Sequence, residues 1–403
     1  RSPERVNPNL ATGATEIVAE ELEILAAAET PPFLPEDELE VDETLRLRYR
    51  YIDLRRPRMF HNLLLRHQVV QAARRYLGDH GFIDVETPIL SKSTPEGARD
   101  FLVPSRLQPG EFYALPQSPQ LYKQLLMISG LERYYQIAKA FRDEDLRADR
   151  QPEHTQIDIE MSFVEEADIQ ETVEGMFAAV FLDTLGVELG RPFPRLSYRE
   201  AMARYGSDKP DLRFGMEIVD VSDVATDIDF RLFADKISTG GVVRGIRAEG
   251  GGSFSRKDVD DLAAEAAVFG AQGLLPIWVE EAGSRSPLQK FTTAEQMQAL
   301  IGRFQAQVGD LILLVADSRA VVEPSLGALR LALAERLCVK RAGWAFAWVV
   351  DFPMFEYDER EKRLKAQHHP FTKPRLNSLE DLKDRPLELR TYAYDLVLNG
   401  VEL

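Results

Sequence analysis

The alternation of residue types between residues 134 and 164 constrains the fold more than any other feature of this sequence. Residues two apart lie on the same face of a β-strand. Two segments, Tyr134–Asp145 and Thr155–Val164, alternate in this way on either side of a charged loop, Leu146–Glu153. One face of the pair collects polar and small residues, namely Gln136, Ala138, Ala140, Arg142, Glu144, Gln156, Asp158 and Glu160. The other face collects apolar ones, namely Tyr135, Ile137, Phe141, Ile157, Ile159 and Met161. The pattern predicts an antiparallel hairpin with one face in a core.

The polar face of this hairpin has two interpretations. An arginine can bind a phosphate through two parallel hydrogen bonds, and a neighbouring carboxylate can accept a hydrogen bond from an adenine amino group. The two alanines leave room for such a ligand. The alternative is an ordinary solvent-facing sheet with an ion pair. The pattern alone leaves both open.

Size and composition describe a globular protein of several domains. At 403 residues we expect two or three domains, and 44% hydrophobic residues supply an ample core. No segment approaches the roughly 20 apolar residues that cross a membrane, and none reads as a signal peptide. The single cysteine, Cys338, excludes an internal disulfide and a cysteine-based zinc cluster, so we expect a cytoplasmic protein without zinc. Because the chain opens with Arg1, we expect that an upstream piece is missing.

The net charge of −17 argues against a nucleic-acid partner only superficially, because a phosphate backbone responds to local potential. Between Arg46 and Arg75 there are nine arginines and one acid, Asp53. This basic island is either a contact surface for nucleic acid or a solvated helix face.

Changes of pattern along the chain indicate an α+β protein. We expect a strand over 16–25 within 1–28, a linker over 29–45, a domain over 46–214, an inserted α+β unit over 215–345, and a return to the first domain over 346–403. The expected helices cover 59–78, 168–185, 258–269, 294–308 and 326–340. The further expected strands cover 83–87, 274–280, 310–316 and 345–352.

Several motifs carry a resemblance to a known family. Phe141–Glu144, a polar loop and Arg150–His154 resemble the second signature motif of the class II aminoacyl-tRNA synthetases. Gly81–Pro88 is similar to the first motif, whose proline-ended strand builds the dimer interface in that class. Thr94–Asp100, Gln117–Lys123 and His368–Phe371 resemble the bacterial-type aspartate enzymes.

The resemblance covers essentially the whole chain and implies its architecture. It implies an antiparallel sheet flanked by helices, with residues 215–345 as an inserted GAD-like domain and residues 1–28 as the tail of an N-terminal, OB-type anticodon-binding β-barrel. The third class II motif, which carries an ATP-binding arginine, is expected after Leu403.

The resemblance also assigns aspartate-binding residues, namely Glu96, Ser118, Gln120, Lys123, Arg142, Asp158, His368 and His369. Ser118-Pro119 is a good start for a helix, and Gln120 and Lys123 would then share its exposed face. By resemblance, Ser118 and Gln120 hold the substrate's amino end, Lys123 pairs with its side-chain carboxylate, and Glu96 lies in a lid. Without the family, a surface lysine on a helix and a capping or solvated loop glutamate would be the preferred interpretations, and a structural histidine pair would remain an alternative.

For ATP the resemblance implies Arg142, Asp143, Glu144, Gln151, His154 and Glu402. Arg142, the catalytic residue, would clamp the α-phosphate, and Glu144 would recognise adenine, whereas the side chain of Asp143 would face away. His154 departs from the family pattern, in which a phenylalanine commonly stacks on adenine.

Asp395 and Glu402 resemble the two carboxylates that hold Mg²⁺ on the ATP phosphates, and hard oxygen ligands suit that ion. They lie seven residues apart on one predicted strand, so they share a face only if a bulge or bend intervenes. The glycines of 240–252 lack the Gly-Lys-Ser/Thr ending of a phosphate-binding loop, and Asp208–Pro210 is interpreted as a turn.

The implied function is ATP-dependent attachment of L-aspartate to tRNA(Asp) by a homodimer, through an aspartyl-adenylate. The resemblance leaves charging of tRNA(Asn) open. Two alternatives remain: an asparaginyl or lysyl enzyme of the same class, and a non-catalytic tRNA-binding paralogue.

Overall fold

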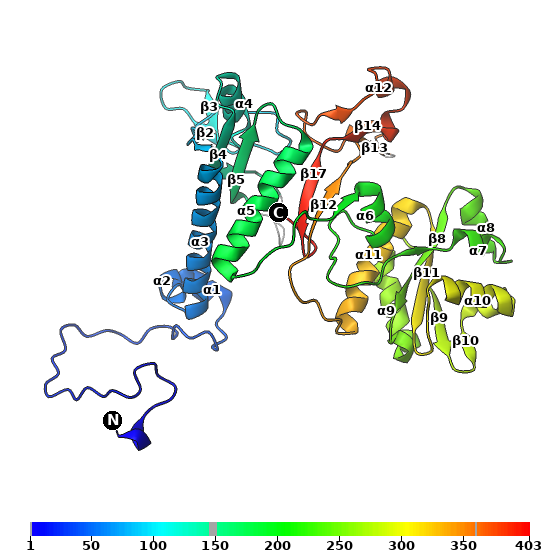
Figure 1. The fold of residues 1–403 in the computed structure, drawn as a ribbon, viewed down its shortest axis with the longest axis horizontal. Helices are drawn as coiled ribbons and strands as arrows, with labels where there is room; N and C mark the ends of the chain where they lie inside the picture. Colours follow the sequence, from blue (N-terminus) through cyan, green and yellow to red (C-terminus); the bar gives the residue numbers. More distant parts are fainter. Residues whose placement is uncertain (1, 145–150, 359–360) are drawn as a thin grey trace. The chain divides into compact units, whose positions relative to one another are not determined.

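The computed structural model describes residues 2–144, 151–358 and 361–403 (Figure 1). The chain divides into two compact units, residues 1–71 and 72–403, which are described separately. Within the described residues, no helix is both long enough and apolar enough to span a membrane.

The first unit contains little regular structure before residue 43. Its elements are η1 (Pro3–Arg5), α1 (Glu43–Arg48), α2 (Arg50–Asp53) and the first part of α3 (Pro57–Asp79). Residues 16–25 form no strand, so that prediction is wrong. Their apolar side chains are largely exposed, with Ile17, Leu22 and Leu25 all above 85%. A strand needs a hydrogen-bonded neighbour, and this segment pairs with no described strand.

Three arginines of the basic island make their contacts inside this unit. Asp53 is fully buried, and the guanidinium groups of Arg46 (2.8 Å), Arg50 and Arg56 (3.7 Å) surround its carboxylate. The hydrogen bond from Arg46 is the main reason that the pKa of Asp53 is lowered. Arg56 also donates to the main-chain oxygens of Glu36 and Leu39. These three arginines therefore fold the segment rather than form a free surface.

The second unit contains three main sheets. In the first, β1 (Ile83–Asp84) runs parallel to β4 (Arg133–Phe141), and β4 pairs antiparallel with β5 (Glu153–Met161). Strand β1 is shorter than the expected 83–87. The elements near this sheet are β2 (Leu102–Pro104), β3 (Phe112–Ala114), α4 (Gln120–Ile128) and α5 (Glu166–Leu185). Helices α3 and α5 confirm the expected helices over 59–78 and 168–185.

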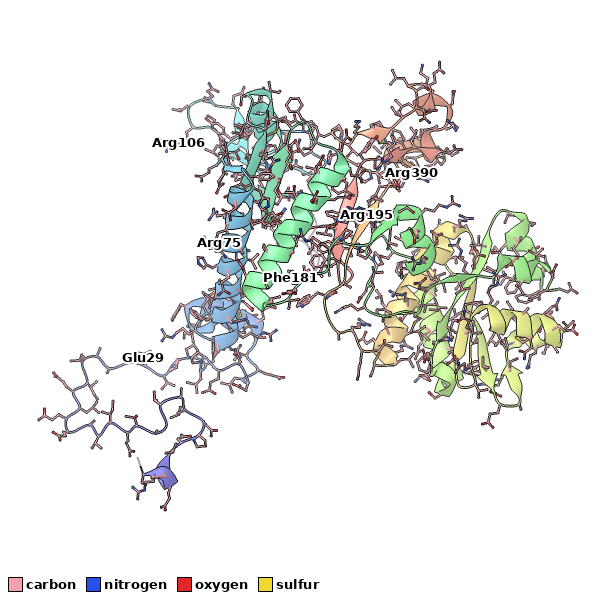
Figure 2. The ribbon with its side chains drawn as sticks, in the orientation of Figure 1. Glu29, Arg75, Arg106, Phe181, Arg195 and Arg390 are labelled. Carbon is pink, nitrogen blue, oxygen red and sulfur yellow. The ribbon has the colours of Figure 1, made fainter. Side chains whose placement is uncertain are left out.

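The second sheet has the order β18–β17–β12–β6. Its strands are β18 (Val401–Glu402), β17 (Tyr394–Leu398), β12 (Phe346–Val350) and β6 (Arg195–Ser197), and α6 (Tyr198–Tyr205) follows β6. Helix α5 packs on this sheet through Phe181, which contacts Phe346. Arg195 of β6 also donates to Gln170 of α5 at 2.7 Å (Figure 2).

Short elements follow β12 along the chain. They are β13 (Phe355–Asp358), β14 (Arg363–Ala366), β15 (Pro374–Arg375), α12 (Asp381–Asp384), η4 (Pro386–Glu388) and β16 (Arg390–Thr391). Strands β13 and β14 form one ribbon, and β15 and β16 form another. These ribbons carry the chain from β12 past the histidine pair and back to β17.

The third sheet is antiparallel throughout, with the order β10–β9–β11–β8–β7. Its strands are β7 (Val219–Asp220), β8 (Val242–Ala248), β9 (Leu275–Glu280), β10 (Gly283–Arg285) and β11 (Leu311–Asp317). Its helices are α7 (Ser222–Thr226), α8 (Arg231–Ser238), η2 (Gly251–Ser253), α9 (Arg256–Ala267), η3 (Pro287–Lys290), α10 (Ala294–Arg303) and α11 (Arg319–Arg336). Every residue of β11 is buried, which explains its uninterrupted apolar sequence.

Two apolar cores lie on opposite faces of the third sheet. One includes residues of α9 and α11, and the other includes residues of α7, α8 and α10. Helix α11 starts at Arg319, seven residues before the expected 326, and includes Pro324. The range expected from sequence, 326–340, excludes this proline. It is tolerated one and a half turns into the helix, at the cost of one main-chain hydrogen bond.

Candidate functional site

The register of the hairpin places the polar residues on one face, as the alternation predicts. Gln136 lies opposite Asp158, Ala138 opposite Gln156, and Ala140 opposite His154. Residues directly opposite each other in an antiparallel pair point to the same face. The face is therefore lined by carboxylate, amide and imidazole groups beside two small alanines.

Lys123 of α4 lies over one part of this face. Its Nζ atom is 2.8 Å from Asp158 Oδ1 and 3.4 Å from Glu160 Oε2. Burial favours the neutral lysine, but the two carboxylates outweigh it and raise the pKa of Lys123. The prediction that Lys123 lies on an exposed helix face is wrong, because its side chain is only 11% exposed. The helical spacing indicated an exposed position, whereas pairing with two acids on β5 draws the lysine inward.

Glu96 lies in the segment before this helix and contacts the helix start. Its carboxylate accepts hydrogen bonds from the hydroxyls of Ser118 and Thr94. Ser118 Oγ in turn accepts from the main-chain N–H of Gln120, and the helix begins at Gln120, one residue later than the expected start at Pro119. The segment is fixed by buried Gln117, whose amide both donates to and accepts from the main chain of Ala98 at 3.0 Å. Gln117 belongs to the motif 117–123, but the sequence alone indicates no role for it.

The two adjacent histidines have different surroundings. Burial lowers the pKa of His369, and the charges of Glu96 and Lys123 act on it in opposite directions. His369 therefore belongs with the Lys123 cluster. His368 instead packs edge-on against Phe352, and its Nε2 atom is buried without a hydrogen-bond partner among the described residues. The resemblance assigns both histidines to the aspartate site, and only His369 has Glu96 and Lys123 acting on its pKa.

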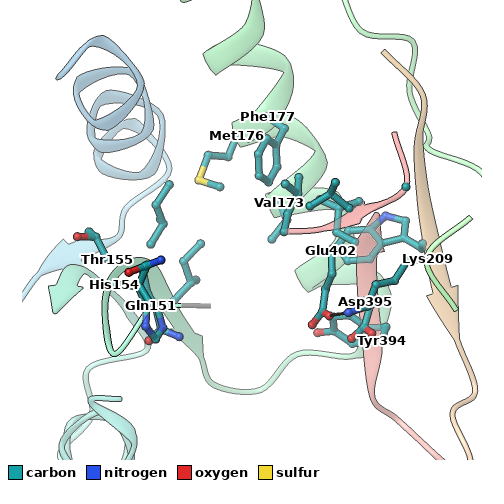
Figure 3. A pocket seen from close by; sticks show the side chains of 18 of the residues that line it. Gln151, His154, Thr155, Val173, Met176, Phe177, Lys209, Tyr394, Asp395 and Glu402 are labelled. Atoms are coloured by element: carbon teal, nitrogen blue, oxygen red, sulfur yellow. Dashed lines mark ion pairs between the residues drawn. The ribbon is translucent and has the colours of Figure 1, made fainter. Parts of the chain in front are cut away.

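A cavity of about 790 Å³ lies between β5, α5 and the hairpin of β17 and β18 (Figure 3). It is lined by most of the residues expected to bind ATP and magnesium, namely Arg142, Glu144, Gln151, His154, Asp395 and Glu402. In Figure 3, Gln151 and His154 come from one side, and Asp395 and Glu402 from the other. Asp143 is exposed and does not line the cavity, in agreement with a side chain that faces away. Most of the polar loop of the second motif, 145–150, lies outside the described residues.

Asp395 and Glu402 share a face because the chain bends between them. Strand β17 ends at Leu398, and Asn399 (φ 54°) and Gly400 (φ 86°) form a tight turn into β18. Positive φ at both central residues is typical of a two-residue hairpin, which favours Asn-Gly. The register pairs Glu402 with Val397, and Asp395 lies two residues from Val397 on the same face. This is the bend that the predicted seven-residue spacing required.

The two acids form an electrostatically strained cluster with Asp208 and Lys209. Burial, Glu402 and Asp208 raise the pKa of Asp395 to about 7, against the opposing effect of Lys209. The Lys209 Nζ atom is 2.6 Å from Glu402 Oε2. We had interpreted Asp208–Pro210 only as a turn. It is a bend, but it also brings Lys209 to the cavity wall and Asp208 close enough to affect the pKa of Asp395, and a charged pair inside a turn gives no sequence signal for such a position.

The aspartate set and the cavity lie at neighbouring parts of β5, and the cavity is lined from both faces of this strand, by His154 and Gln156 on one face and by Ile157 and Ile159 on the other. Asp158 contacts Lys123, whereas His154, four residues earlier on β5, is close enough to Arg142 and Glu144 for both charges to affect its pKa. Four residues of a strand span about 13 Å. Between them, Gln156 Oε1 and Asp158 Oδ2 are buried without a hydrogen-bond partner among the described residues. Such orphaned polar atoms are rare in proteins, and a catalytic role is one of their recognised explanations.

The two carboxylates of Asp395 and Glu402 suit Mg²⁺ better than a metal ion whose ligands all come from the protein. Among the described residues there is no group of three or more His, Cys, Asp or Glu side chains that could hold a metal ion. Mg²⁺ is usually bound through one or two carboxylates, with water and substrate phosphates as its other ligands. Asp395 and Glu402 on the cavity wall supply such a pair.

Comparisons with known proteins bear on the family of the chain rather than on its individual site residues. The family model described as tRNA synthetases class II (D, K and N) matches residues 42–403. A protein of Moorella thermoacetica named Aspartate--tRNA(Asp/Asn) ligase is 56% identical over 405 residues, which cover 100% of this chain and 68% of the relative. The proteins of the same name from Symbiobacterium thermophilum and Heliobacterium modesticaldum are 55% and 54% identical, over 100% and 99% of this chain and 69% and 66% of their own lengths.

Proposed function

Because the chain belongs to the class II tRNA synthetases of the D, K and N group, we propose that it uses ATP to attach L-aspartate to tRNA(Asp). One observation carries the assignment of substrate. Buried Lys123 pairs with Asp158 of β5, and residues earlier on the same strand, including His154 and Gln156, line a cavity of about 790 Å³. An ammonium group in that position suits an amino acid with an anionic side chain. It disfavours asparagine and the cationic lysine as substrates.

The reaction has two steps. The α-carboxylate of aspartate attacks the α-phosphate of ATP, which releases pyrophosphate and leaves aspartyl-adenylate. The 3′-hydroxyl of the terminal adenosine of the tRNA then takes the aspartyl group and releases AMP. No covalent bond to the enzyme is needed, so the side chains act by positioning and by electrostatic stabilisation.

Arg142 is the proposed catalytic residue. Its guanidinium binds the α-phosphate and the attacking carboxylate, and so offsets the negative charge that grows in the transition state. Glu144 accepts a hydrogen bond from the adenine amino group, Gln151 contacts the nucleotide, and His154 stacks on the base. All four side chains line the same cavity, which supports a shared ligand.

The aspartate substrate occupies the neighbouring part of the face. Lys123 pairs with its side-chain carboxylate, while Asp158, Ser118 and Gln120 hold its ammonium end. Glu96, in the segment that Gln117 fixes, closes over the aspartate. His369 contributes to the same site, and His368 lies farther from it. The hydrogen bond between Ser118 and Glu96 supports a joint role.

Asp395 and Glu402 are the proposed ligands of Mg²⁺. When bound, the ion supplies positive charge to the ATP phosphates. The contribution of the chain is to hold two carboxylates on one face of a tight hairpin, at the wall of the cavity.

The remaining proposals concern partners and domains. The relatives' printed name supports charging of tRNA(Asn) as well as tRNA(Asp). We assign residues 46–214 and 346–403 to the catalytic core, 215–345 to an inserted GAD-like domain, 29–45 to a linker and 1–28 to the end of an anticodon-binding domain. Exposed apolar residues on α3, including Phe60 (62%) and Leu63 (51%), support a homodimer. The single cysteine suits the cytoplasm.

Aspartate-dependent exchange between ATP and pyrophosphate tests the function. The assay is run on the full-length protein with aspartate, asparagine or lysine, and with Arg142→Ala as the control. We expect exchange with aspartate only, and a loss of about 10²–10³-fold in the variant. Exchange with asparagine or lysine would identify a sister enzyme. Absence of ATP binding would instead identify a tRNA-binding paralogue.

A further inference from the structure

The cluster at the end of the second sheet contains one cation and three acids. Lys209 makes its ion pair with Glu402 at 2.6 Å, and Asp208 and Asp395 also act on its charge. The side chains of Lys209 and Glu402 are 33% and 43% exposed. The pair is therefore neither fully buried nor fully hydrated, and its partners can exchange without a large desolvation cost.

The position of Lys209 is fixed by the main chain of the segment 206–210. Gly206 has φ +68° and lies against α11 so closely that a Cβ atom there would come within 2.1 Å of the Glu323 carbonyl oxygen. Ser207 Oγ accepts a hydrogen bond from the N–H of Lys209 at 3.0 Å. A glycine is therefore required three residues before the lysine, and no larger side chain fits there.

Helix α11, which packs on the third sheet, holds the main chain that follows Lys209. Arg330 of α11 is 2% exposed and donates to the main-chain oxygens of Asp211 (2.8 Å), Phe214 (2.7 Å) and Gly215 (2.9 Å). Asp211 also packs on Gly400, the turn residue between Asp395 and Glu402. The bend that carries Lys209 is thus anchored to the carboxylate hairpin and to α11 together.

We propose that Lys209 is a positioning residue that holds the Asp395–Glu402 pair before metal and nucleotide bind, and that it competes with the divalent cation for these carboxylates. The proposal rests on the proposed function, because that function assigns the pair to Mg²⁺. In the metal-free protein, the positive charge of Lys209 keeps Asp395 and Glu402 from moving apart through their mutual repulsion. It also sets the metal affinity low enough for the cation to leave.

Direct metal binding tests this role without an activity measurement. Mn²⁺ stands in for Mg²⁺ and is titrated into the protein, and free Mn²⁺ is followed by electron paramagnetic resonance. The proteins compared are the unchanged chain, Lys209→Met, Lys209→Arg and Glu402→Gln. We expect Lys209→Met to bind Mn²⁺ about two- to five-fold more tightly, because the competing charge is gone. Lys209→Arg keeps the charge and should restore the original affinity, and Glu402→Gln should bind more weakly than all three.

Thermal unfolding without metal provides the second measurement. Lys209→Met should lower the melting temperature by about 1–3 °C, and saturating Mn²⁺ should remove that difference. Equal or weaker Mn²⁺ binding by Lys209→Met would overturn the proposal, as would tighter binding by a variant that melts at the same temperature as the unchanged chain. Loss of the proposed function is recognised separately, since aspartate-dependent exchange would then be absent from the full-length protein with Lys209 unchanged.

Discussion

Two lysines of the same unit each lie against two or more acids, in contrasting surroundings. Lys123 is 11% exposed and pairs with Asp158, which is 10% exposed. Lys209 is 33% exposed and pairs with Glu402, which is 43% exposed. The first pair joins a helix to a paired strand, and the second joins a bend to the end of a hairpin. An ion pair strengthens as water is excluded, so the first is a fixed element of the site and the second can exchange partners.

The largest expected effect in this comparison is that of Lys123→Met. Methionine keeps the volume of the side chain but leaves Asp158 and Glu160 without their cation. Loss of one partner from a buried charge pair in a binding site costs about 2–5 kcal/mol of binding, so we expect kcat/KM for aspartate in pyrophosphate exchange to fall by about 10²–10³-fold.

Lys209→Met is the matched control, because it removes the same group from the more exposed cluster. It should change kcat/KM for aspartate by less than about fivefold. If the two variants lost the same activity, the difference in burial would not be what separates the two clusters.

The second effect concerns pH and the acid Asp395. Its pKa of about 7 in the folded protein exceeds the ordinary 3.8, so between these values only the folded state binds the proton. Stability without metal therefore falls as pH rises from about 4 to 7. Asp395→Asn removes this dependence, and at pH 8 it should raise the free energy of unfolding by about 4 kcal/mol relative to its effect at pH 4.

Urea unfolding at a series of pH values measures this slope. Glu402→Gln is the companion variant, because Glu402 is the largest charge that raises the pKa of Asp395. Glu402→Gln should move the pH range over which stability falls to lower pH, and the dependence should remain. A flat difference between Asp395→Asn and the unchanged protein from pH 4 to pH 8 would contradict the raised pKa.

The hairpin was predictable because it depends on local alternation, which fixes the faces of β4 and β5 from sequence alone. The cavity residues followed only from the resemblance, since their contacts cross segments far apart in the chain. Glu402 lies on the same face as Asp395 because the chain turns at Asn399-Gly400. Which face Glu402 takes depends on the register of β18 against β17, and the sequence does not give that register. The burial of Lys123 and the approach of Lys209 could not be predicted, because each depends on where a distant acid lies in space.

A smaller effect separates the two acids that share Lys123. Glu160 lies 3.4 Å from the lysine and is 30% exposed, whereas Asp158 lies at 2.8 Å and is 10% exposed. We expect Glu160→Gln to raise KM for aspartate by about two- to fivefold and to leave kcat nearly unchanged. Asp158→Asn should cost more than ten times as much in kcat/KM, because its partner is closer and more deeply buried. Equal losses would show that Lys123 depends on total charge rather than on one oriented pair.

The smallest expected effect is that of His154→Phe, which leaves the charges of both clusters unchanged. Burial and the nearby charge of Arg142 lower the pKa of His154, against a smaller opposite effect of Glu144, so its imidazole is neutral at pH 7.5. A neutral ring and a phenylalanine ring offer similar faces to adenine. We therefore expect KM for ATP in exchange assays to change by less than about threefold at pH 7.5. Below the lowered pKa the imidazole gains a proton that phenylalanine cannot bind, so the two proteins should diverge only at acid pH. A loss above tenfold at pH 7.5 would reject stacking as the role of His154 and would point instead to a hydrogen bond from its ring.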